Sequence, residues 1–386
     1  MISQKNPTLA NLFISFMKLG ATSFGGPAMV SYIRKMAVEQ KQWLDDESFR
    51  YGVALCQMIP GATAMQTSAY VGLRTRGKAG ALASFVGFGL PAFFIMMILS
   101  AIYVHTYRLP MVISVFNGLQ IIIVAIIANA TVSFGTTYLK KRMDIIIAIF
   151  AASMFGLGVN PIIAILLAAL LGLLFYNRQN IIQKTIDSES KSFFTRPVLL
   201  ILSVATIGLV ALFFIHRGLY DLAILMFKVD LFAFGGGFAS VPIMFHQVVD
   251  VQSWMDGRTF LNGIALGQIT PGPIVITATF IGYLMYGPVG GIIATIGIFL
   301  PSFLMVVGIV PYFDRLRTLS YFNKAIGGIL CSFVGLLLSV TIRFAVDIPW
   351  DFSRIVLAGV AFSALILKVD IFWVVLIGTV ISMKIL

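Results

Sequence analysis

An internal repeat constrains the fold of this 386-residue chain more than any other feature of its sequence. The segment YGVALCQMIPG at 51–61 matches NGIALGQITPG at 262–272, an offset of 211 residues (272 minus 61). Upstream, Phe24-Gly25-Gly26 matches Phe234-Gly235-Gly236, and downstream the match continues through shared glycines and prolines. Ordered identities of this kind do not arise by chance. The chain is therefore a duplicated unit, and its halves should share one fold.

The composition places this unit in a membrane. Hydrophobic residues make up 59% of the chain and charged residues 11%, whereas soluble domains average about 25% charged residues. A spanning helix needs about 20 apolar residues. The sequence therefore predicts an all-α polytopic membrane protein, with candidate spans at 79–104, 110–138, 144–159, 161–176, 197–216, 289–313, 322–345, 353–367 and 369–385.

The net charge of +12 would suggest a nucleic-acid partner in a soluble protein. Here the basic residues flank apolar stretches, as the positive-inside rule expects, so the predicted partner is the lipid bilayer and not nucleic acid. Cys56 and Cys331 are far apart, and the three histidines are isolated. We therefore expect no metal, no cofactor and no enzymatic activity.

The chain divides into four predicted parts: a first membrane repeat at 8–176, a polar cytoplasmic linker at 177–196, an extra crossing helix at 197–216 and a second, inverted repeat at 219–386. The inversion follows from loop charges, because the basic loop at 74–78 matches an uncharged loop at 284–288. We expect the N-terminus in the cytoplasm and the protein in the cytoplasmic membrane. Inverted repeats with broken helices are typical of secondary transporters, whose substrate site lies near the bilayer midplane.

Each half is interrupted twice by residues that break helices. The interruptions are Gly25-Gly26-Pro27 and Pro60-Gly61 in the first half, and Gly235-Gly236-Gly237 and Pro271-Gly272 in the second. Broken backbone survives in lipid only where protein buries it or a cavity lines it. The pattern predicts broken or re-entrant helices that meet at a central site. Alternatively, the glycines only permit close helix packing and the prolines only kink helices.

Helices that start at such breaks would direct free N–H groups and positive dipole ends into the centre, which suits an anion. The candidate side-chain donors near the breaks are Gln57, Thr63, Gln66, Gln268 and Thr270. Gln57 and Gln268 are equivalent and precede a break by three residues. Each amide could bond the ligand or the free carbonyls of the broken helix.

Charged residues near the breaks are further candidates. Lys18 and Lys228 are equivalent, and a lysine in an apolar run costs roughly 2.5–3.5 kcal/mol on insertion scales. They bind substrate in one interpretation and extend to the membrane surface in the other. Asp230 either neutralises Lys228 or carries a coupled proton. Glu39 and Asp250, also equivalent, are either coupling carboxylates or solvated residues at the interface.

Two further aspartates have a structural explanation. Asp45 and Asp256 are equivalent, and each stands just before a predicted helix. Aspartate is a preferred N-cap residue. We therefore expect both side chains to cap the helices that follow.

The motifs as a set resemble the chromate transporter (CHR) family in its fused, two-domain form. The resemblance rests on Phe24-Gly25-Gly26-Pro27, on Trp43 and Trp254, and on Leu-Gly-Gln-Ile-Thr-Pro-Gly-Pro from 266 to 273. The first half departs from the family pattern at Ala62 and Ser31. The resemblance implies a secondary active transporter that exports chromate, a tetrahedral oxyanion, is coupled to protons and confers chromate resistance.

Electrostatics also favours export. A dianion that leaves an inside-negative cell gains roughly 4.6 kcal/mol per 100 mV, so export is downhill even without coupling. Two alternatives remain open, a proton symporter for sulfate or another oxyanion, and a passive anion channel. The expected partners are oxyanions, protons and lipid, with a homodimer left open.

Overall fold

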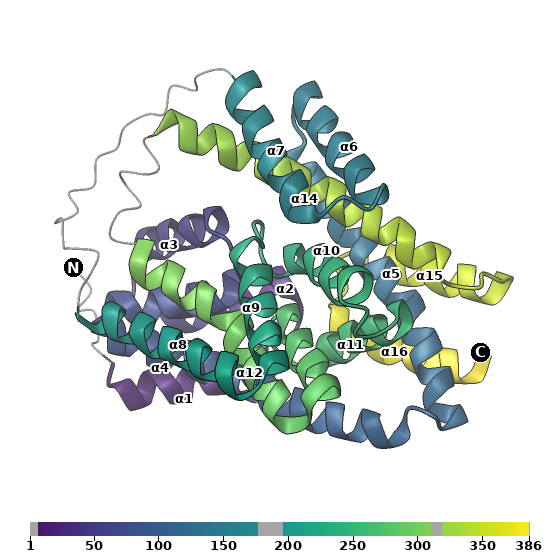
Figure 1. Cartoon of the computed structure of the whole chain (residues 1–386), viewed down its shortest axis with the longest axis horizontal. Helices are drawn as coiled ribbons and strands as arrows, with labels where there is room; N and C mark the ends of the chain where they lie inside the picture. Colours follow the sequence, from purple (N-terminus) through teal and green to yellow (C-terminus); the bar gives the residue numbers. More distant parts are fainter. Residues whose placement is uncertain (1–6, 177–195, 310–318, 386) are drawn as a thin grey trace.

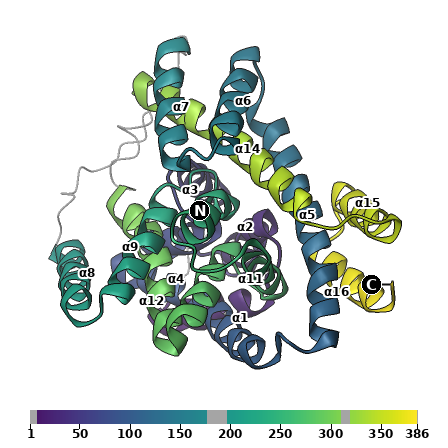
Figure 2. The ribbon, with the colours of Figure 1, turned by 45° about the vertical axis from the view of Figure 1, so that its right-hand side comes forward.

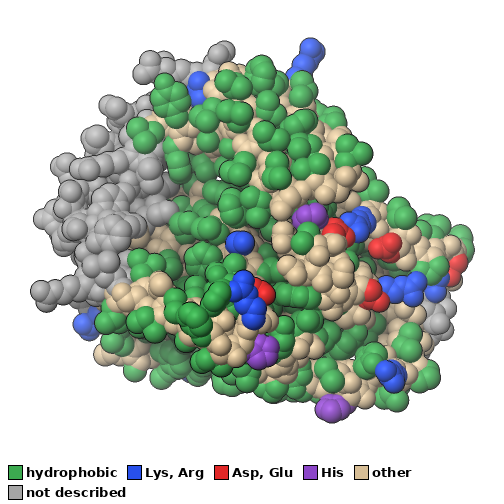
Figure 3. All heavy atoms as spheres, in the orientation of Figure 1, with side chains coloured by type: hydrophobic (Ala, Val, Ile, Leu, Met, Phe, Trp, Pro, Cys, Tyr) green, Lys and Arg blue, Asp and Glu red, His purple; other side chains and the backbone are tan. Residues whose placement is uncertain are grey.

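The computed structural model describes residues 7–176, 196–309 and 319–385, and every regular element in these ranges is helical. Helices at 63–106, 110–138, 274–308 and 320–346 are long and apolar enough to cross a membrane. One face of the molecule is covered mostly by hydrophobic side chains (Figure 3). The predicted all-α membrane architecture is confirmed.

The two repeats contain equivalent helices in the same order (Figure 1). The first repeat comprises α1 (Leu9–Thr22), α2 (Gly26–Arg34), η1 (Lys35–Gln40), α3 (Asp46–Met58), α4 (Thr63–Thr106), α5 (Pro110–Tyr138), α6 (Arg142–Gly156) and α7 (Pro161–Phe175). The second comprises α9 (Arg217–Leu231), η2 (Gly237–Ala239), α10 (Ser240–Phe245), η3 (His246–Val251), α11 (Gly257–Ile269), η4 (Ile274–Ile276), α12 (Thr277–Ile309), α14 (Ser320–Val346), α15 (Phe352–Ile366) and α16 (Ile371–Ile385).

Helix α8 (Arg196–Ile215) precedes the second repeat and corresponds to the predicted extra helix at 197–216. The predicted linker at 177–196 lies outside the described residues, except for Arg196, where α8 begins. The boundaries of the four predicted parts stay predictions.

Helices end and restart at all four predicted breaks. In the first repeat α1 stops at Thr22 and α3 at Met58, and in the second α9 stops at Leu231 and α11 at Ile269. Smaller features are duplicated too, since η1 and η3 are both π-helices. The backbone of the two repeats is therefore alike even where the side chains differ.

Helices α4 and α12 are each folded back on themselves. Arg76-Gly77 has φ/ψ of −138/22 and 64/−153, and Tyr286-Gly287 has −139/27 and 60/−152. Ser84 Oγ donates to the carbonyl of Ser68 at 2.7 Å, although sixteen residues of straight helix would span about 24 Å. Each element is thus a hairpin whose short arm leads away from a break and whose long arm contains a predicted span. Residues 310–313 of the predicted span 289–313 lie outside the described residues.

The long arms of α4 and α12 run in opposite directions. Phe85 packs on Phe303 with ring centroids 5.2 Å apart, whereas Met97, further along α4, lies against Gly291, nearer the start of α12. Because these arms are equivalent, the two repeats are related by an approximate two-fold rotation. This arrangement is the one that inverted repeats require.

Helices α6, α7, α15 and α16 are shorter than a membrane span. Each has 15 residues, or about 22 Å, against a hydrocarbon thickness of about 30 Å. The sequence predicts four spans here, at 144–159, 161–176, 353–367 and 369–385. The helices have these bounds to within three residues, but none of them is long enough to cross a membrane, because the turns at Asn160 and Asp370 divide each apolar run in two.

The repeats exchange these short helices. Helices α6 and α7 pack on α14 of the second repeat, while α15 and α16 pack on α5 of the first (Figure 2). Small residues allow the close approach, since a Cβ at Gly172 would lie 3.1 Å from Gly328 and one at Gly118 would lie 2.2 Å from Ser382 Cβ. Each half therefore supplies part of the packing of the other.

The two predicted caps are confirmed. Asp45 Oδ1 accepts a hydrogen bond from the backbone N–H of Ser48, and Asp256 Oδ1 accepts one from Thr259, both at 2.7 Å. The N–H of Ser48 holds the pKa of the Asp45 carboxyl below its ordinary value, because it stabilises the charged form. Both caps fix the start of the helix that leads to the second break of each repeat.

Candidate functional site

The breaks of one repeat are hydrogen-bonded to those of the other. The N–H of Gly61 donates to the carbonyl of Ala233 at 3.0 Å, and the N–H of Gly272 donates to that of Ser23 at 2.9 Å. Gly61 and Gly272 are equivalent, as are Ser23 and Ala233. We call these reciprocal bonds the Gly61 crossing and the Gly272 crossing.

The remaining break segments close on the same centre. A Cβ at Gly236 would lie 3.0 Å from Thr63 Oγ1, in the first turn of α4. A Cβ at Gly237 would lie 3.1 Å from Ile274, in η4. The structure therefore brings together segments of the two repeats that lie more than 170 residues apart in the sequence, including the predicted residues Gly61, Thr63, Gly236 and Gly272, with Gly237 beside them. Gly25 is the left-handed residue before α2, with φ of 79°.

Glycine is required at both crossings. Gly61 has φ of 119° and Gly272 has φ of 116°, in the region that side chains rarely adopt. A Cβ would lie 2.1 Å from Ser302 Oγ at Gly61, and 2.7 Å from Ala92 Cβ at Gly272. The alternative in which these glycines serve only helix packing does not account for their positive φ angles.

Buried polar atoms without hydrogen-bond partners gather on the residues at the breaks. Among the described residues, the buried side-chain atoms without a partner are Ser23 Oγ, Gln66 Oε1, Asp230 Oδ1 and Gln268 Nε2. Each buried polar group without a partner lowers the stability of the fold by about 1–3 kcal/mol, so four of them at the breaks indicate a function other than stability. Atoms of this kind are available to a ligand or to water.

The Gly61 crossing carries acceptors. Asp230 is fully buried, and its Oδ2 accepts from the backbone N–H and the hydroxyl of Ser302 at 2.8 and 2.7 Å. The same hydroxyl accepts from the N–H of Ala62 at 3.0 Å, just before α4 begins. Gln66 Nε2 donates to the carbonyl of Pro60, which leaves its oxygen free. A buried carboxylate is thereby linked to the start of a helix of the other repeat.

The Gly272 crossing carries donors instead. Its two atoms without partners, Ser23 Oγ and Gln268 Nε2, can both donate a hydrogen bond. The positions equivalent to Asp230 and Ser302 are Gly20 and Ala92, so no carboxylate stands on this side. Thr270 donates to carbonyls of its own helix, at Leu266 and Gly267. The two crossings share a backbone and differ in chemistry.

The predicted lysines lie elsewhere. Lys18 and Lys228 are exposed, on helix faces turned away from the buried residues Phe16 and Met226. Asp230 bonds Ser302, so the expected neutralisation by Lys228 is replaced by a serine contact that the sequence does not signal. The role of Lys18 and Lys228 in substrate binding stays a prediction.

The two other carboxylate candidates form ion pairs. Glu39 pairs with Arg34 at 2.6 Å, with both side chains largely exposed. Asp250 accepts two hydrogen bonds from Arg343 of α14, at 2.8 and 2.6 Å, and contacts His246 Nδ1 at 3.2 Å. Glu39 thus lies in a solvated setting, whereas Asp250 joins η3 to α14.

Equivalent surfaces of the two repeats differ in exposure. Gln57 is exposed and lines a cavity of about 480 Å³ with Arg34 and Arg50, whereas Gln268 is only 7% exposed. The difference arises from the packing of the long helices. Helix α5 packs over α11 of the second repeat, where Gln120 donates to Asn262 at 2.8 Å. In Figure 1, α3 stands apart from α14, the counterpart of α5. The structure is therefore open over the broken helices of one repeat and closed over those of the other.

Phenylalanines show the same asymmetry. Phe344 of α14 packs on Phe245 and Phe260 of its own repeat, with centroids 5.0 and 6.3 Å away. Its counterpart Phe134 packs on Phe333 of the opposite repeat, at 5.0 Å. The equivalent phenylalanines of the two long helices thus have different partners.

No group of three or more metal-ligating side chains occurs in the part of the chain that the structure describes. Cys56 and Cys331 are buried free thiols. The site is therefore built from backbone, amides, hydroxyls and one carboxylate.

Comparison with known proteins identifies relatives for both halves. The family described as chromate transporter matches residues 10–173 and 220–383. An uncharacterized transporter of Methanocaldococcus jannaschii is 43% identical over 100% of this chain and 96% of its own length. The chromate transport protein of Cupriavidus metallidurans is 30% identical, covering 89% of this chain and 85% of that protein. That of Pseudomonas aeruginosa is 28% identical over 86% of this chain. No solved structure matches.

Proposed function

The chain belongs to the chromate transporter family, and from that premise we propose that it exports chromate across the cytoplasmic membrane as a proton-coupled secondary transporter, not as an enzyme. In the cell this activity would confer chromate resistance. The observation that carries the proposal is the pair of crossings, where buried polar atoms without partners meet helix ends from both repeats.

Chromate would bind at the Gly272 crossing. A chromate dianion has only acceptor oxygens, and this crossing offers the donors Ser23 Oγ and Gln268 Nε2. Helix starts near the breaks add N–H groups and positive dipole ends, each contributing about 0.3–2 kcal/mol. A site without a fixed cation releases its anion more readily than one that contains a buried lysine.

Asp230 would carry the coupled proton at the Gly61 crossing. Protonation of a carboxylate replaces an acceptor with a donor, which changes its bonds to Ser302 and, through Ser302, the hold on Ala62. The start of α4 would then be free to move. Because only one crossing has a carboxylate, proton and anion would occupy separate, linked places.

The asymmetry of the two repeats supports alternating access. In the second repeat, Gln268 is covered by helices that pack over α11, while its counterpart Gln57 lines an open cavity. Exchanging these arrangements between pseudo-equivalent repeats would close one side and open the other. A passive channel has no need of two mutually exclusive packings, so this feature favours a transporter.

The open cavity would face the cytoplasm. Arg76, at the tip of the α4 hairpin, donates to the carbonyl of Pro7 at 2.6 Å, so the start of α1 lies at the same end of the molecule. Tyr70 donates to the carbonyl of Ser48, so α3 approaches the centre from that end as well. The basic residues 74–78 indicate the cytoplasmic side by the positive-inside rule, and the repeats would insert with inverted topology.

Transport in everted membrane vesicles tests the function. Chromate should accumulate inside the vesicles, saturate with concentration and fall when a protonophore dissipates the proton gradient. Accumulation of sulfate in right-side-out vesicles, driven by an inward proton gradient, would support the symporter instead. Flux that is proportional to concentration and shows no counterflow would support the channel. A chloride control identifies general anion leakage.

A further inference from the structure

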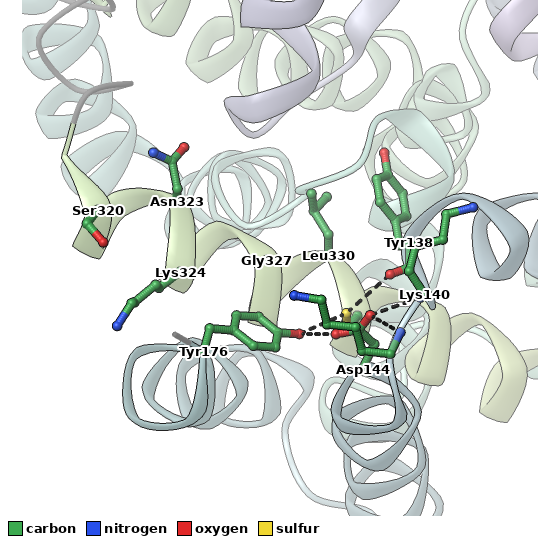
Figure 4. A pocket seen from close by; sticks show the side chains of 11 residues that line it. Tyr138, Lys140, Asp144, Tyr176, Ser320, Asn323, Lys324, Gly327 and Leu330 are labelled. Atoms are coloured by element: carbon green, nitrogen blue, oxygen red, sulfur yellow. Dashed lines mark hydrogen bonds between the residues drawn. The ribbon is translucent and has the colours of Figure 1, made fainter. Parts of the chain in front are cut away.

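A second cavity lies away from the crossings, at the end of the molecule where α5, α6, α7 and α14 meet (Figure 4). Its volume is about 260 Å³. Its lining includes the lysines Lys140, Lys141 and Lys324, together with Tyr138, Tyr176 and Asn323. The proposed transport mechanism uses none of these residues.

The cavity is positively charged. Its lining has three lysines and one aspartate, which leaves two positive charges (three minus one). The carboxylate of Asp144 is already engaged, because it accepts from the N–H groups of Lys140 and Lys141 at 2.9 and 2.7 Å and from Tyr176 at 2.6 Å. Figure 4 shows the Tyr176 hydroxyl directed at this carboxylate. The aspartate therefore shapes the floor of the cavity while the amines remain the dominant charges.

The second repeat has no such cavity chemistry. The positions equivalent to Lys140, Lys141 and Lys324, at an offset of 210, are Trp350, Asp351 and Ser114. A role in helix packing would be expected in both repeats, because the folds are alike. The basic lining occurs on one side only, which is the pattern of a site that serves one membrane surface.

Exposed apolar side chains lie next in sequence to residues that line the cavity. Leu174 and Phe175, just before Tyr176, are 68% and 57% exposed, and Tyr321, beside Ser320 of the lining, is 75% exposed. In a protein that spans a membrane, exposed apolar residues next to a basic cavity suit a molecule with an anionic head and hydrocarbon chains. A free oxyanion has no apolar surface that could contact these side chains.

We propose that this cavity binds a phosphate group, supplied by the head group of an anionic phospholipid. The amines of Lys141 and Lys324 bind the phosphate, and Lys140, whose amine donates to the carbonyl of Thr136, adds positive charge nearby, while the exposed residues of α7 and α14 contact the acyl chains. Basic cavities between membrane helices on the cytoplasmic side are suited to such head groups. This assignment requires that the chain spans a membrane and is independent of which anion it transports.

The test measures thermal stabilisation of the full chain in detergent by phosphatidylglycerol, with phosphatidylcholine and inorganic phosphate as the other additions. Phosphatidylglycerol should stabilise the protein and phosphatidylcholine should not. Each of Lys141→Gln and Lys324→Gln should weaken the apparent affinity about fivefold, since a lysine near an anionic surface contributes about 1 kcal/mol. Arg354→Gln, at the position equivalent to Asp144, is the matched control and should leave the affinity unchanged.

The outcomes separate the two sources of phosphate. Equal protection by inorganic phosphate, lost in the lysine variants, would assign the cavity to a free anion and overturn the lipid assignment. Protection by phosphatidylglycerol that survives in the Lys141→Gln, Lys324→Gln double variant would overturn the site itself. Native mass spectrometry of the same variants checks the result where a variant is too unstable for melting curves.

Discussion

The hydroxyl oxygens of Thr131 and Thr341 lie 3.3 Å apart, and these two threonines are equivalent residues of the two repeats. A residue can meet its own counterpart only on the axis that relates two copies. The contact therefore locates the approximate two-fold axis between α5 and α14. The reciprocal bonds Gly61–Ala233 and Gly272–Ser23 obey the same rotation.

Replacing Gln268 should weaken chromate binding more than replacing Gln57. A hydrogen bond to a charged group is worth about 1.5–3 kcal/mol, so Gln268→Ala should raise the dissociation constant for chromate about 10- to 100-fold. Gln57→Ala is the matched control and should change it less than about threefold, because this amide is exposed. Binding by thermal shift measures both, and equal effects would remove Gln268 from the site.

Asp230→Asn should uncouple transport from protons. The amide keeps the shape of the carboxyl group and cannot release a proton, so chromate counterflow should persist while stimulation by a proton gradient disappears. Asp221→Asn, an exposed residue of the same helix paired with Arg217, should behave like the unmodified protein. Proton-stimulated export by Asp230→Asn at the normal rate would exclude Asp230 as the coupling group.

Gly61→Ala should destabilise the protein more than Gly77→Ala. Both glycines have positive φ, but a Cβ at Gly61 would overlap Ser302 whereas Gly77 has no atom within 4 Å. We expect a loss of about 1 kcal/mol for Gly77→Ala and of about 3 kcal/mol for Gly61→Ala, since overpacking adds to backbone strain. Thermal midpoints in detergent measure the difference, which similar values for the two variants would contradict.

The caps at Asp45 and Asp256 should each contribute about 1 kcal/mol to stability, which Asp→Ala removes and Asp→Asn largely retains. The folded-state pKa of Asp45 is lowered, so its charge-dependent contribution is full above the ordinary value of 3.8 and is lost as the pH falls through the lower folded value. Asp45→Asn should lack this acid-dependent part. Melting curves between pH 7 and pH 3 measure it, and identical pH profiles would contradict the assignment.

Arg343→Gln should open the covered repeat. It removes the bonds from Arg343 to Asp250 that join α14 to η3, which we expect to shift the conformational equilibrium about fivefold if the pair is worth about 1 kcal/mol. In a chain without its native cysteines, a cysteine at position 268 should then react faster with a thiol reagent. Arg354→Gln, which alters the pair with Asp351 within one turn of α15, is the control. An unchanged labelling rate would argue against alternating access by this route.

The sequence predicts the helical architecture, the duplication and the positions of the four breaks, because glycine, proline and long apolar runs act locally. It also predicts that Gln268, Thr63 and the break glycines belong to one centre, since broken backbone in a membrane must be buried by protein or line a cavity. Charge alternation between loops predicts the opposed orientation that the antiparallel arms of α4 and α12 display.

Other features depend on tertiary contacts and could not be predicted in this way. Ser302 and Ser23 carry no motif, and their importance arises only when α12 and α1 meet the breaks. Lys18 and Lys228 occupy apolar runs, yet the helix phase turns them outward. The hairpin turns at Gly77 and Gly287 show in the sequence only as glycines. An apolar sequence pattern is the same for one straight helix and for two antiparallel arms, so it does not predict the turn.

The exchange of short helices between repeats has a consequence for how such a protein can be assembled. Since α6 and α7 complete the packing of α14, and α15 and α16 complete that of α5, a half made alone would leave apolar helix faces uncovered. Two halves synthesised as separate polypeptides would therefore find each other by the same surfaces that join them within one chain. The same interface would therefore form whether one gene or two genes encode the halves. The functional unit is defined by this shared interior and not by the covalent link between the halves.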